Sequence, residues 1–187
     1  VGYGCGGKCT LCEVKIYSLI IKLKKMSKRD ELKQMPLYQK AEQILKITMG
    51  LVEIVPNENE FLQETTVRFM MENAFLIPAK IAGATGVGLY DLKMENATLI
   101  RKAARELYVQ AGSFRFEECI KDQDYIELLR QTIDEFRLLF VDWVAGFDVW
   151  DYVKDNWGLF NPPGVNVHDK DPDDDIPFDP DDFFEDI

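Results

Sequence analysis

The sequence DYIELLRQTIDEFRLLFVDWVAGF, residues 124–147, decides the fold. Large apolar side chains recur along it at intervals of three and four residues, which places them on one face of an α-helix. The members of this series are Tyr125, Leu128, Leu129, Ile133, Phe136, Leu139, Phe140, Trp143, Val144 and Phe147. Asp122 or Asp124 can cap the start of the helix, and Gly146 lies at its end. The stretch therefore predicts a long helix with one buried face.

Three further stretches have the same period. The first starts at Pro36, whose missing N–H costs nothing in the first turn of a helix, and it runs to residue 55. Asn57 or Asn59 can then cap the next helix. The third stretch covers about residues 89–111, and we expect Gly112 to be its C-cap.

The second stretch covers about residues 60–84 and contains a proline. Pro78 lacks an N–H, and its ring clashes with the carbonyl four residues earlier, so we expect a kink or break near Ala74. No part of residues 36–147 alternates as a strand does. Four helices with short connections predict an all-α protein, with an up-down-up-down four-helix bundle over residues 36–147.

The net charge of −11 is distributed unevenly along the 187 residues. Residues 1–36 carry eight Lys/Arg against three Asp/Glu, residues 37–147 carry 12 against 17, and residues 148–187 carry two against 13. A single class of partner therefore cannot be inferred from the total charge. These blocks divide the chain into a basic leader containing Cys and Gly (1–35), the four-helix bundle (36–147), an aromatic strap (148–164) and an acidic, largely disordered tail (165–187).

The aromatic strap, residues 148–164, holds four large rings close together. They belong to Trp150, Tyr152, Trp157 and Phe160. An exposed cluster of this size would aggregate or bind a partner. We therefore expect these rings to pack against the bundle.

The acidic tail mixes carboxylates with large apolar side chains and is a candidate partner-binding segment. Its candidate residues are Asp173, Asp174, Asp175, Ile176, Pro177, Phe178, Phe183 and Phe184. Residues 173–178 resemble the acidic tip of bacterial single-stranded DNA-binding proteins, although nine residues follow the Phe here. Charge would steer such a segment to a basic groove, and Phe would anchor it there. The alternative is a tail that serves only solubility.

Candidate nucleic-acid-binding residues gather on the predicted third helix and near it. They are Lys80, Lys93, Arg101, Lys102 and Arg105. Arg101 and Arg105 are one helical turn apart and could contact a phosphate backbone. The alternative is an ordinary solvated helix face, because Glu95 and Glu106 could pair with these charges.

Three cysteines, Cys5, Cys9 and Cys12, lie in a glycine-rich stretch. Their spacing resembles the cluster-binding loop of radical S-adenosylmethionine enzymes, in which three thiolates hold a four-iron cluster. Those enzymes continue with alternating strands and helices, whereas we expect only helices here. The alternative is a leader without a function, and we expect neither a cofactor nor a bound metal.

The sequence offers no set of catalytic groups. The single histidine, His168, lies in the acidic tail, so no Ser/Cys–His pair can be assembled. No signal peptide is evident, and the apolar run at residues 14–23 contains two lysines and falls short of the ~20 residues of a spanning helix. We therefore expect a non-enzymatic protein of the cytoplasm that makes no membrane contact.

Two short motifs carry a family resemblance: residues 36–41 (PLYQKA) and residues 77–83 (IPAKIAG). The second is similar to an Ile-Pro-x-x-Ile-Ala-x-Gly stretch, with the glycine one position earlier. Residues 35–147 resemble the bacterial four-helix-bundle family of ribosomal RNA intervening-sequence proteins and diversity-generating-retroelement accessory proteins. The resemblance implies a ring-like pentamer and, for the accessory proteins, binding to a reverse transcriptase and to nucleic acid.

Taken with this resemblance, the residues predict a non-catalytic, oligomeric accessory or adaptor protein, acting in a nucleic-acid-processing system such as a retroelement. One alternative is direct RNA or DNA binding by the basic residues of the third helix. The other is an iron–sulfur protein that uses the N-terminal cysteines.

Overall fold

The computed structural model describes residues 28–56, 59–116 and 123–171. All the regular secondary structure in these three ranges is helical, which confirms the prediction of an all-α protein. None of the helices within these ranges is both long enough and apolar enough to cross a membrane.

The chain enters the fold through two helices, α2 (Lys28–Gln34) and α3 (Pro36–Glu53). Pro36 occupies the first turn of α3, as predicted, because no hydrogen bond is lost there. The buried face of α3 includes Ala41, Ile44 and Leu51, which recur at helical spacing. None of the residues of α2 is buried.

The second stretch folds as three consecutive helical segments: α4 (Glu60–Leu62), the π-helix η1 (Gln63–Val67) and α5 (Arg68–Gly86). The side chain of Asn59 accepts a hydrogen bond from the Leu62 amide at 3.1 Å, so the predicted cap is confirmed.

Of the kink or break expected near Ala74, the break is wrong, because α5 continues through Pro78. Ala74, Ile77 and Pro78 are all buried, and the packing of this face offsets the hydrogen bond that proline removes. The irregular backbone instead lies at η1, near the start of the stretch.

The third and fourth stretches form α6 (Tyr90–Ser113) and α7 (Asp124–Ala145), with a short 3₁₀ turn, η2 (Phe114–Phe116), after α6. Gly146 is the C-cap of α7, as predicted. Gly112 is not the C-cap of α6, because the helix continues past it to Ser113. Residue 122 lies outside the described residues, and the N-cap of α7 is Gln123, which makes no capping hydrogen bond with its side chain.

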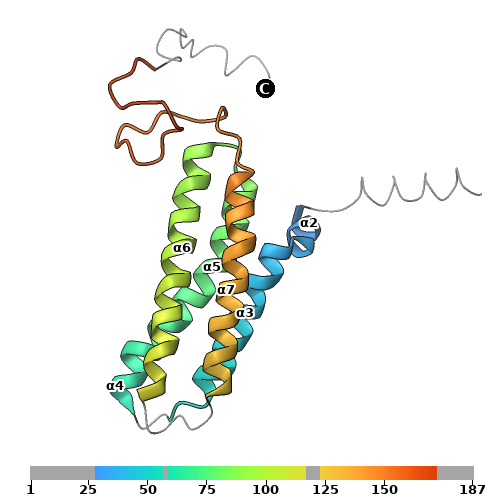
Figure 1. Ribbon diagram of the computed structural model, residues 1–187, viewed down its shortest axis with the longest axis vertical. Helices are drawn as coiled ribbons and strands as arrows, with labels where there is room; N and C mark the ends of the chain where they lie inside the picture. The colour runs from blue at the N-terminus through green and yellow to red at the C-terminus, as the bar shows by residue number, and fades with distance from the viewer. Residues whose placement is uncertain (1–27, 57–58, 117–122, 172–187) are drawn as a thin grey trace, which may run out of the picture.

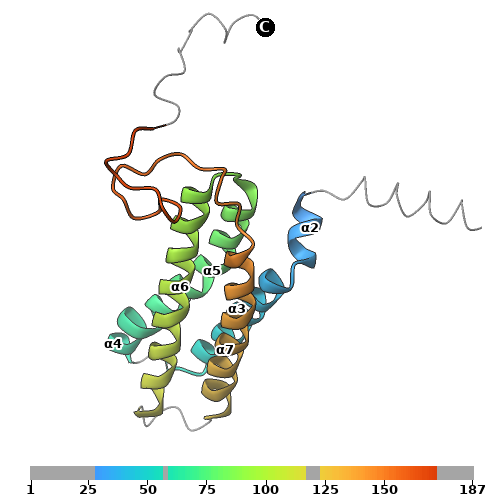
Figure 2. The ribbon, with the colours of Figure 1, turned by 45° about the horizontal axis from the view of Figure 1, so that its top comes forward.

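The four long helices lie side by side. α3 contacts α5 and α7, and α6 contacts the same two helices. Successive long helices run in opposite directions along the long axis of the molecule (Figure 1), and a view tilted by 45° shows the same arrangement (Figure 2).

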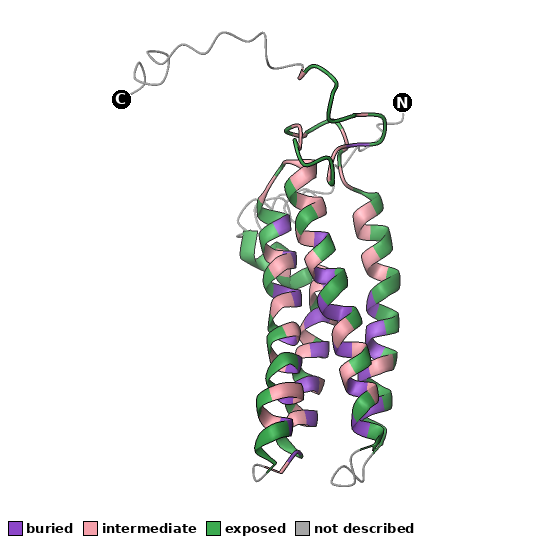
Figure 3. Ribbon diagram, turned by 90° about the vertical axis from the view of Figure 1, so that its left-hand side faces the viewer, coloured by how far each residue is buried: buried purple, intermediate pink, exposed green. Residues whose placement is uncertain are grey.

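The core consists of the apolar faces that these helices turn toward one another, which are buried in Figure 3. Thr48 and Thr132 are also buried, and each hydroxyl donates a hydrogen bond to a carbonyl four residues earlier in its own helix, at 2.9 and 2.7 Å. The largest fully buried apolar side chains are Phe114, Phe136, Ile44, Leu51, Met70, Ile77, Ile81, Ile100, Leu107, Ile126 and Leu129.

The aromatic strap contains neither helix nor strand and lies at the end of the molecule where α6 begins and α7 ends (Figure 1). The expectation that all four rings pack against the bundle is wrong for two of them. Trp150 is 85% exposed and Trp157 is 88% exposed, whereas Tyr152 and Phe160 are half-buried. The reason is local: hydrogen bonds within the segment determine its path, and this path turns both indoles outward.

The 3₁₀ turn η2 supplies a matched pair for testing the core. We expect Phe114→Ala to lower the free energy of unfolding by about 3–5 kcal/mol, because Phe114 is fully buried. Phe116→Ala, two residues away, should change it by less than about 0.5 kcal/mol, because Phe116 is 88% exposed. Urea denaturation followed by circular dichroism measures both values, and equal losses would contradict the position of the core.

Candidate partner-binding groove

Three basic side chains in the middle of α6 are exposed. Arg101, Lys102 and Arg105 lie within little more than one turn of this helix. Lys102 pairs with Glu106 at 3.7 Å. Neither Arg101 nor Arg105 has an ion-pair partner within residues 28–56, 59–116 and 123–171. Two guanidinium groups, one turn apart, are therefore available to a ligand.

The other two predicted basic residues lie elsewhere. Lys80 is half-buried on α5. The ammonium of Lys93 lies 5.9 Å from the centre of the Phe147 ring, just beyond the end of α7, in a cation–π contact. Along α6, Lys93 is about 12 Å from Arg101. The structure thus brings together Arg101, Lys102 and Arg105, with Lys93 nearer the start of the helix.

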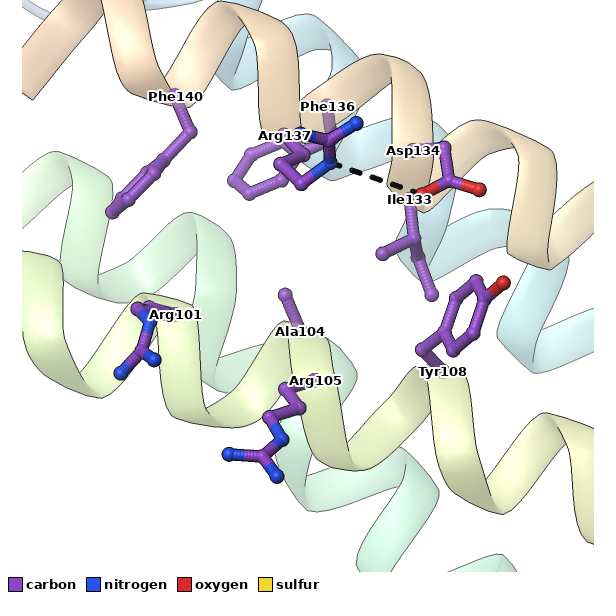
Figure 4. A pocket seen from close by; sticks show the side chains of 9 residues that line it. All are labelled: Arg101, Ala104, Arg105, Tyr108, Ile133, Asp134, Phe136, Arg137 and Phe140. Carbon is purple, nitrogen blue, oxygen red and sulfur yellow. Dashed lines mark ion pairs between the residues drawn. The ribbon is translucent and has the colours of Figure 1, made fainter.

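A cavity of about 300 Å³ opens between α6 and α7 (Figure 4). Arg101 and Arg105 line its α6 side together with Ala104 and Tyr108. We call this cavity the α6/α7 groove. Arg101 and Arg105, which were predicted to bind nucleic acid, therefore also line the groove.

The groove exists because α6 presents a small side chain where α7 presents large ones. Ala104 ends at its β-carbon, whereas Ile133, Phe136 and Phe140 line the opposite wall at helical spacing. The rings of Phe136 and Phe140 are stacked, with centroids 6.0 Å apart. A methyl group facing a row of this kind cannot fill the space between the two helices. The floor of the groove is consequently apolar.

One end of the groove is fixed by Arg130 of α7. Its guanidinium lies 3.7 Å from the centre of the Tyr108 ring and donates a hydrogen bond to the Tyr108 carbonyl at 2.9 Å. A β-carbon at Gly112 would lie only 2.7 Å from an Nη atom of Arg130, so glycine leaves the space that this contact needs. The contact joins α6 to α7 and orients the Tyr108 ring, which lines the groove.

The charged side chains at the groove are mainly cationic. Arg137 joins Arg101 and Arg105, and its one ion-pair partner among the described residues is Asp134 at 3.9 Å. Both members of that pair are exposed, and such a pair contributes about 0–1 kcal/mol. An apolar floor with arginines at its edge suits a ligand that combines a large apolar group with carboxylates.

A second surface lies in the loop that follows α7. Asp155 organises it, because its carboxylate accepts hydrogen bonds from the amides of Trp157, Leu159 and Phe160 at 2.8–3.0 Å. Asn161 donates to the Asp155 carbonyl and accepts from its amide, at 2.9 and 2.8 Å. The loop backbone is thus held by local hydrogen bonds.

The Asp155 loop presents large apolar side chains to solvent. Trp157 is 88% exposed, Leu159 is 74% exposed, and Trp150 lies 85% exposed in the same strap. Near Trp157, three carboxylate residues, Asp91, Glu95 and Asp155, line a hollow together with one lysine, Lys154. This surface combines exposed aromatic rings with negative charge, which is the opposite charge to that of the α6/α7 groove.

Hydrogen bonding makes Asp155 a stronger acid. The amide of Trp157 has the largest effect in lowering the pKa of Asp155 below its ordinary value, and the amides of Phe160 and Leu159 lower it further. A lowered pKa stabilises the loop at any pH above the ordinary value of about 4, and the contribution is lost as the pH falls through the folded value, which lies lower.

We expect Asp155→Asn to loosen this loop at neutral pH, because an amide has one acceptor oxygen in place of two. The backbone amides of Trp157, Leu159 and Phe160 should exchange with solvent several-fold faster, as followed by NMR. In the unchanged protein, the chemical shifts of these amides should move toward random-coil values only below about pH 4. Asp142→Asn on α7 is the control, and equal effects of the two substitutions would contradict the role of Asp155.

Several predicted residues lie outside the described ranges. The partner-binding candidates of the acidic tail, from Asp173 to Phe184, are among them, and so are Cys5, Cys9 and Cys12. Within the described ranges, no group of three or more His, Cys, Asp or Glu side chains is placed to hold a metal ion. The tail site and the iron–sulfur alternative both stay predictions.

No protein-family model matches this chain, and neither any curated protein nor any solved structure is similar enough to count as a match. The resemblance to the bacterial four-helix-bundle family consequently stays a prediction that is based on two short motifs.

Sequence reasoning identified Arg101 and Arg105 but missed the groove beside them. Phe136 and Phe140 were expected only as members of the apolar face of residues 124–147, and neither Tyr108 nor Arg137 was singled out. A small residue at 104 opposite large residues on α7 is the signal, but it can be read only when the alignment of the two helices is known.

Proposed function

We propose that this protein is a non-catalytic, oligomeric accessory or adaptor protein that holds a partner protein in the α6/α7 groove. The observation that carries the proposal is the combination of an apolar floor with arginines that have no ion-pair partner among the described residues. In this proposal the four long helices form an up-down-up-down four-helix bundle. The bundle serves as a rigid frame for the groove.

The groove defines the chemistry of the partner. Phe140 and Tyr108, which are half-buried, offer aromatic contact to one inserted side chain. Arg101 and Arg105 can each form a charge-assisted hydrogen bond with a carboxylate. The partner segment that fits best therefore carries an aromatic or large aliphatic residue flanked by Asp or Glu.

Direct binding of RNA or DNA is the second candidate function. It is favoured by the same two guanidinium groups, because a phosphate backbone could take the place of the carboxylates. The charge of residues 37–147, with 12 Lys/Arg against 17 Asp/Glu, opposes it over longer distances. We therefore rank a protein partner first.

Self-association is part of the proposal. Leu138 and Val141 are 59% and 56% exposed and lie one turn apart on α7, where a second copy could cover them. The family resemblance implies five copies and a partner such as a reverse transcriptase, and we propose a cytoplasmic setting. Each of these points belongs to the proposal.

Light scattering tests the assembly. We expect a mass that is a multiple of 21.6 kDa, with a pentamer as the specific expectation. Leu138→Glu combined with Val141→Glu should lower the mass, because burying two carboxylates in an apolar contact is unfavourable. Thr98→Glu, on the exposed face of α6, should leave it unchanged. A strict monomer at all concentrations would exclude an oligomeric adaptor.

A binding titration tests the groove. The probe is a synthetic acidic peptide with one Phe between Asp residues, followed by fluorescence anisotropy with the full chain. We expect saturable binding that weakens with salt, and Arg105→Glu should weaken it at least about tenfold. Arg68→Glu on α5 is the control, because it changes the charge equally at a distance from the groove.

The same titration with a single-stranded oligonucleotide separates the two candidate functions. The nucleic-acid function would be shown by oligonucleotide binding whose affinity falls steeply with salt and with Arg101→Ala. If the oligonucleotide binds in this way and the peptide does not bind, nucleic-acid binding replaces the adaptor function. If neither probe binds at millimolar concentration, the groove has no role as a binding site.

A further inference from the structure

We propose that the chain carries its own ligand for the α6/α7 groove. The ligand is residues 181–186 of the acidic tail, Asp-Asp-Phe-Phe-Glu-Asp, bound within the same molecule. The inference rests on the proposed function, since it takes the groove to be a site for acidic segments with large apolar residues. Its consequence is that an external partner has to displace the tail.

The shape of the groove fits a phenylalanine ring. A cavity of about 150 Å³ with apolar walls is large enough to bind benzene. The α6/α7 groove, at about 300 Å³, has room for one benzyl group together with the adjoining backbone. Neighbouring side chains of an extended segment point to opposite sides, so either Phe183 or Phe184 enters the groove and the other ring lies at its edge.

The charges are complementary. Arg101 and Arg105 have no ion-pair partner among the described residues, and Arg137 has only its exposed contact with Asp134. The four carboxylates of residues 181–186 flank the two rings on both sides. Figure 4 shows the guanidinium groups of Arg101 and Arg105 turned away from α7. Both side chains are exposed, so rotation about their bonds would bring them to carboxylates that flank a Phe ring in the groove.

The length of the chain favours this segment over the nearer one. Arg105 lies about 22 Å along α6 from the helix end beside the strap. From Asp171, the last described residue, an extended chain covers at most about 24 Å to Phe178 and about 41 Å to Phe183. Arg101, at the nearer end of the groove, is about 16 Å from the same helix end, so Phe183 and Phe184 have more spare chain than Phe178 for reaching the groove.

Tethering makes even weak binding effective. A short flexible connection gives the tail an effective concentration in the millimolar range. A segment with a millimolar dissociation constant would then occupy the groove in about half of the molecules. An external partner would have to bind more tightly than this to compete, so the tail sets a threshold for binding.

Chemical labelling of arginine tests the proposal in the full chain. Phenylglyoxal reacts with exposed guanidinium groups, and peptide mass spectrometry reports the rate at each arginine. We expect Phe183→Ala combined with Phe184→Ala to raise the labelling rates of Arg101 and Arg105 about twofold, because docking in half of the molecules halves the rate. Arg68 is the internal reference. Neither substitution changes the charge, so a general electrostatic effect of the tail cannot cause the increase.

Phe178→Ala is the matched control, because it removes the same ring from the neighbouring acidic segment. It should leave the labelling rates of Arg101 and Arg105 unchanged. If Phe178→Ala gives the increase and the double variant does not, the assignment of residues 181–186 is wrong. If no variant changes the rates, the tail does not occupy the groove.

Dilution distinguishes docking within one molecule from docking between two copies. Protection of Arg105 should be independent of protein concentration, and loss of protection on dilution would overturn docking within one chain. The anisotropy titration with the external peptide tests the groove as a binding site independently of whether the tail docks there. If the peptide binds equally well to the unchanged chain and to the double Phe variant, the groove is a site but the tail is not its ligand.

Discussion

The fold depends on burying the apolar faces of four helices against one another. The way in which these faces pack determines where the other features of the molecule lie. Four of the six buried residues of α6 are alanines, Ala97, Ala103, Ala104 and Ala111, and the other two are Ile100 and Leu107. α7 turns larger residues inward, including Leu129, Ile133 and Phe136. Where Ala104 faces this row, the interior is left incompletely filled, and the groove is the result.

Local chemistry and periodicity were sufficient to predict much of the helical structure. The start of α3 at Pro36, the capping of α4 by Asn59 and the end of α7 at Gly146 depend on each residue and its immediate neighbours. Pro78 and Gly112 were misjudged because tertiary contacts decide their roles. Burial keeps α5 intact around Pro78, and Gly112 makes room for a side chain that comes from α7.

The candidate site was predictable only in part for the same reason. Arg101 and Arg105 could be identified because charges one turn apart on a helix are visible in the sequence. The groove depends on the alignment of α6 with α7, which the sequence of either helix does not specify. Asp155 was also missed, although an Asp followed by Asn, Trp and Gly is typical of a turn in which the carboxylate binds amides further along the chain.

The hydroxyls of Thr48 and Thr132 have a consequence for how the helices align. Both bond only to carbonyls of their own helix, so these buried threonines place no polar constraint on the sliding of one helix along another. Alignment must then come from shape and from contacts at the periphery, such as Asn73 with Gln110 at 3.3 Å and Lys40 with Glu135 at 2.8 Å. The interior should consequently tolerate exchanges among apolar residues of equal volume, whereas selection for one register should act on peripheral polar residues.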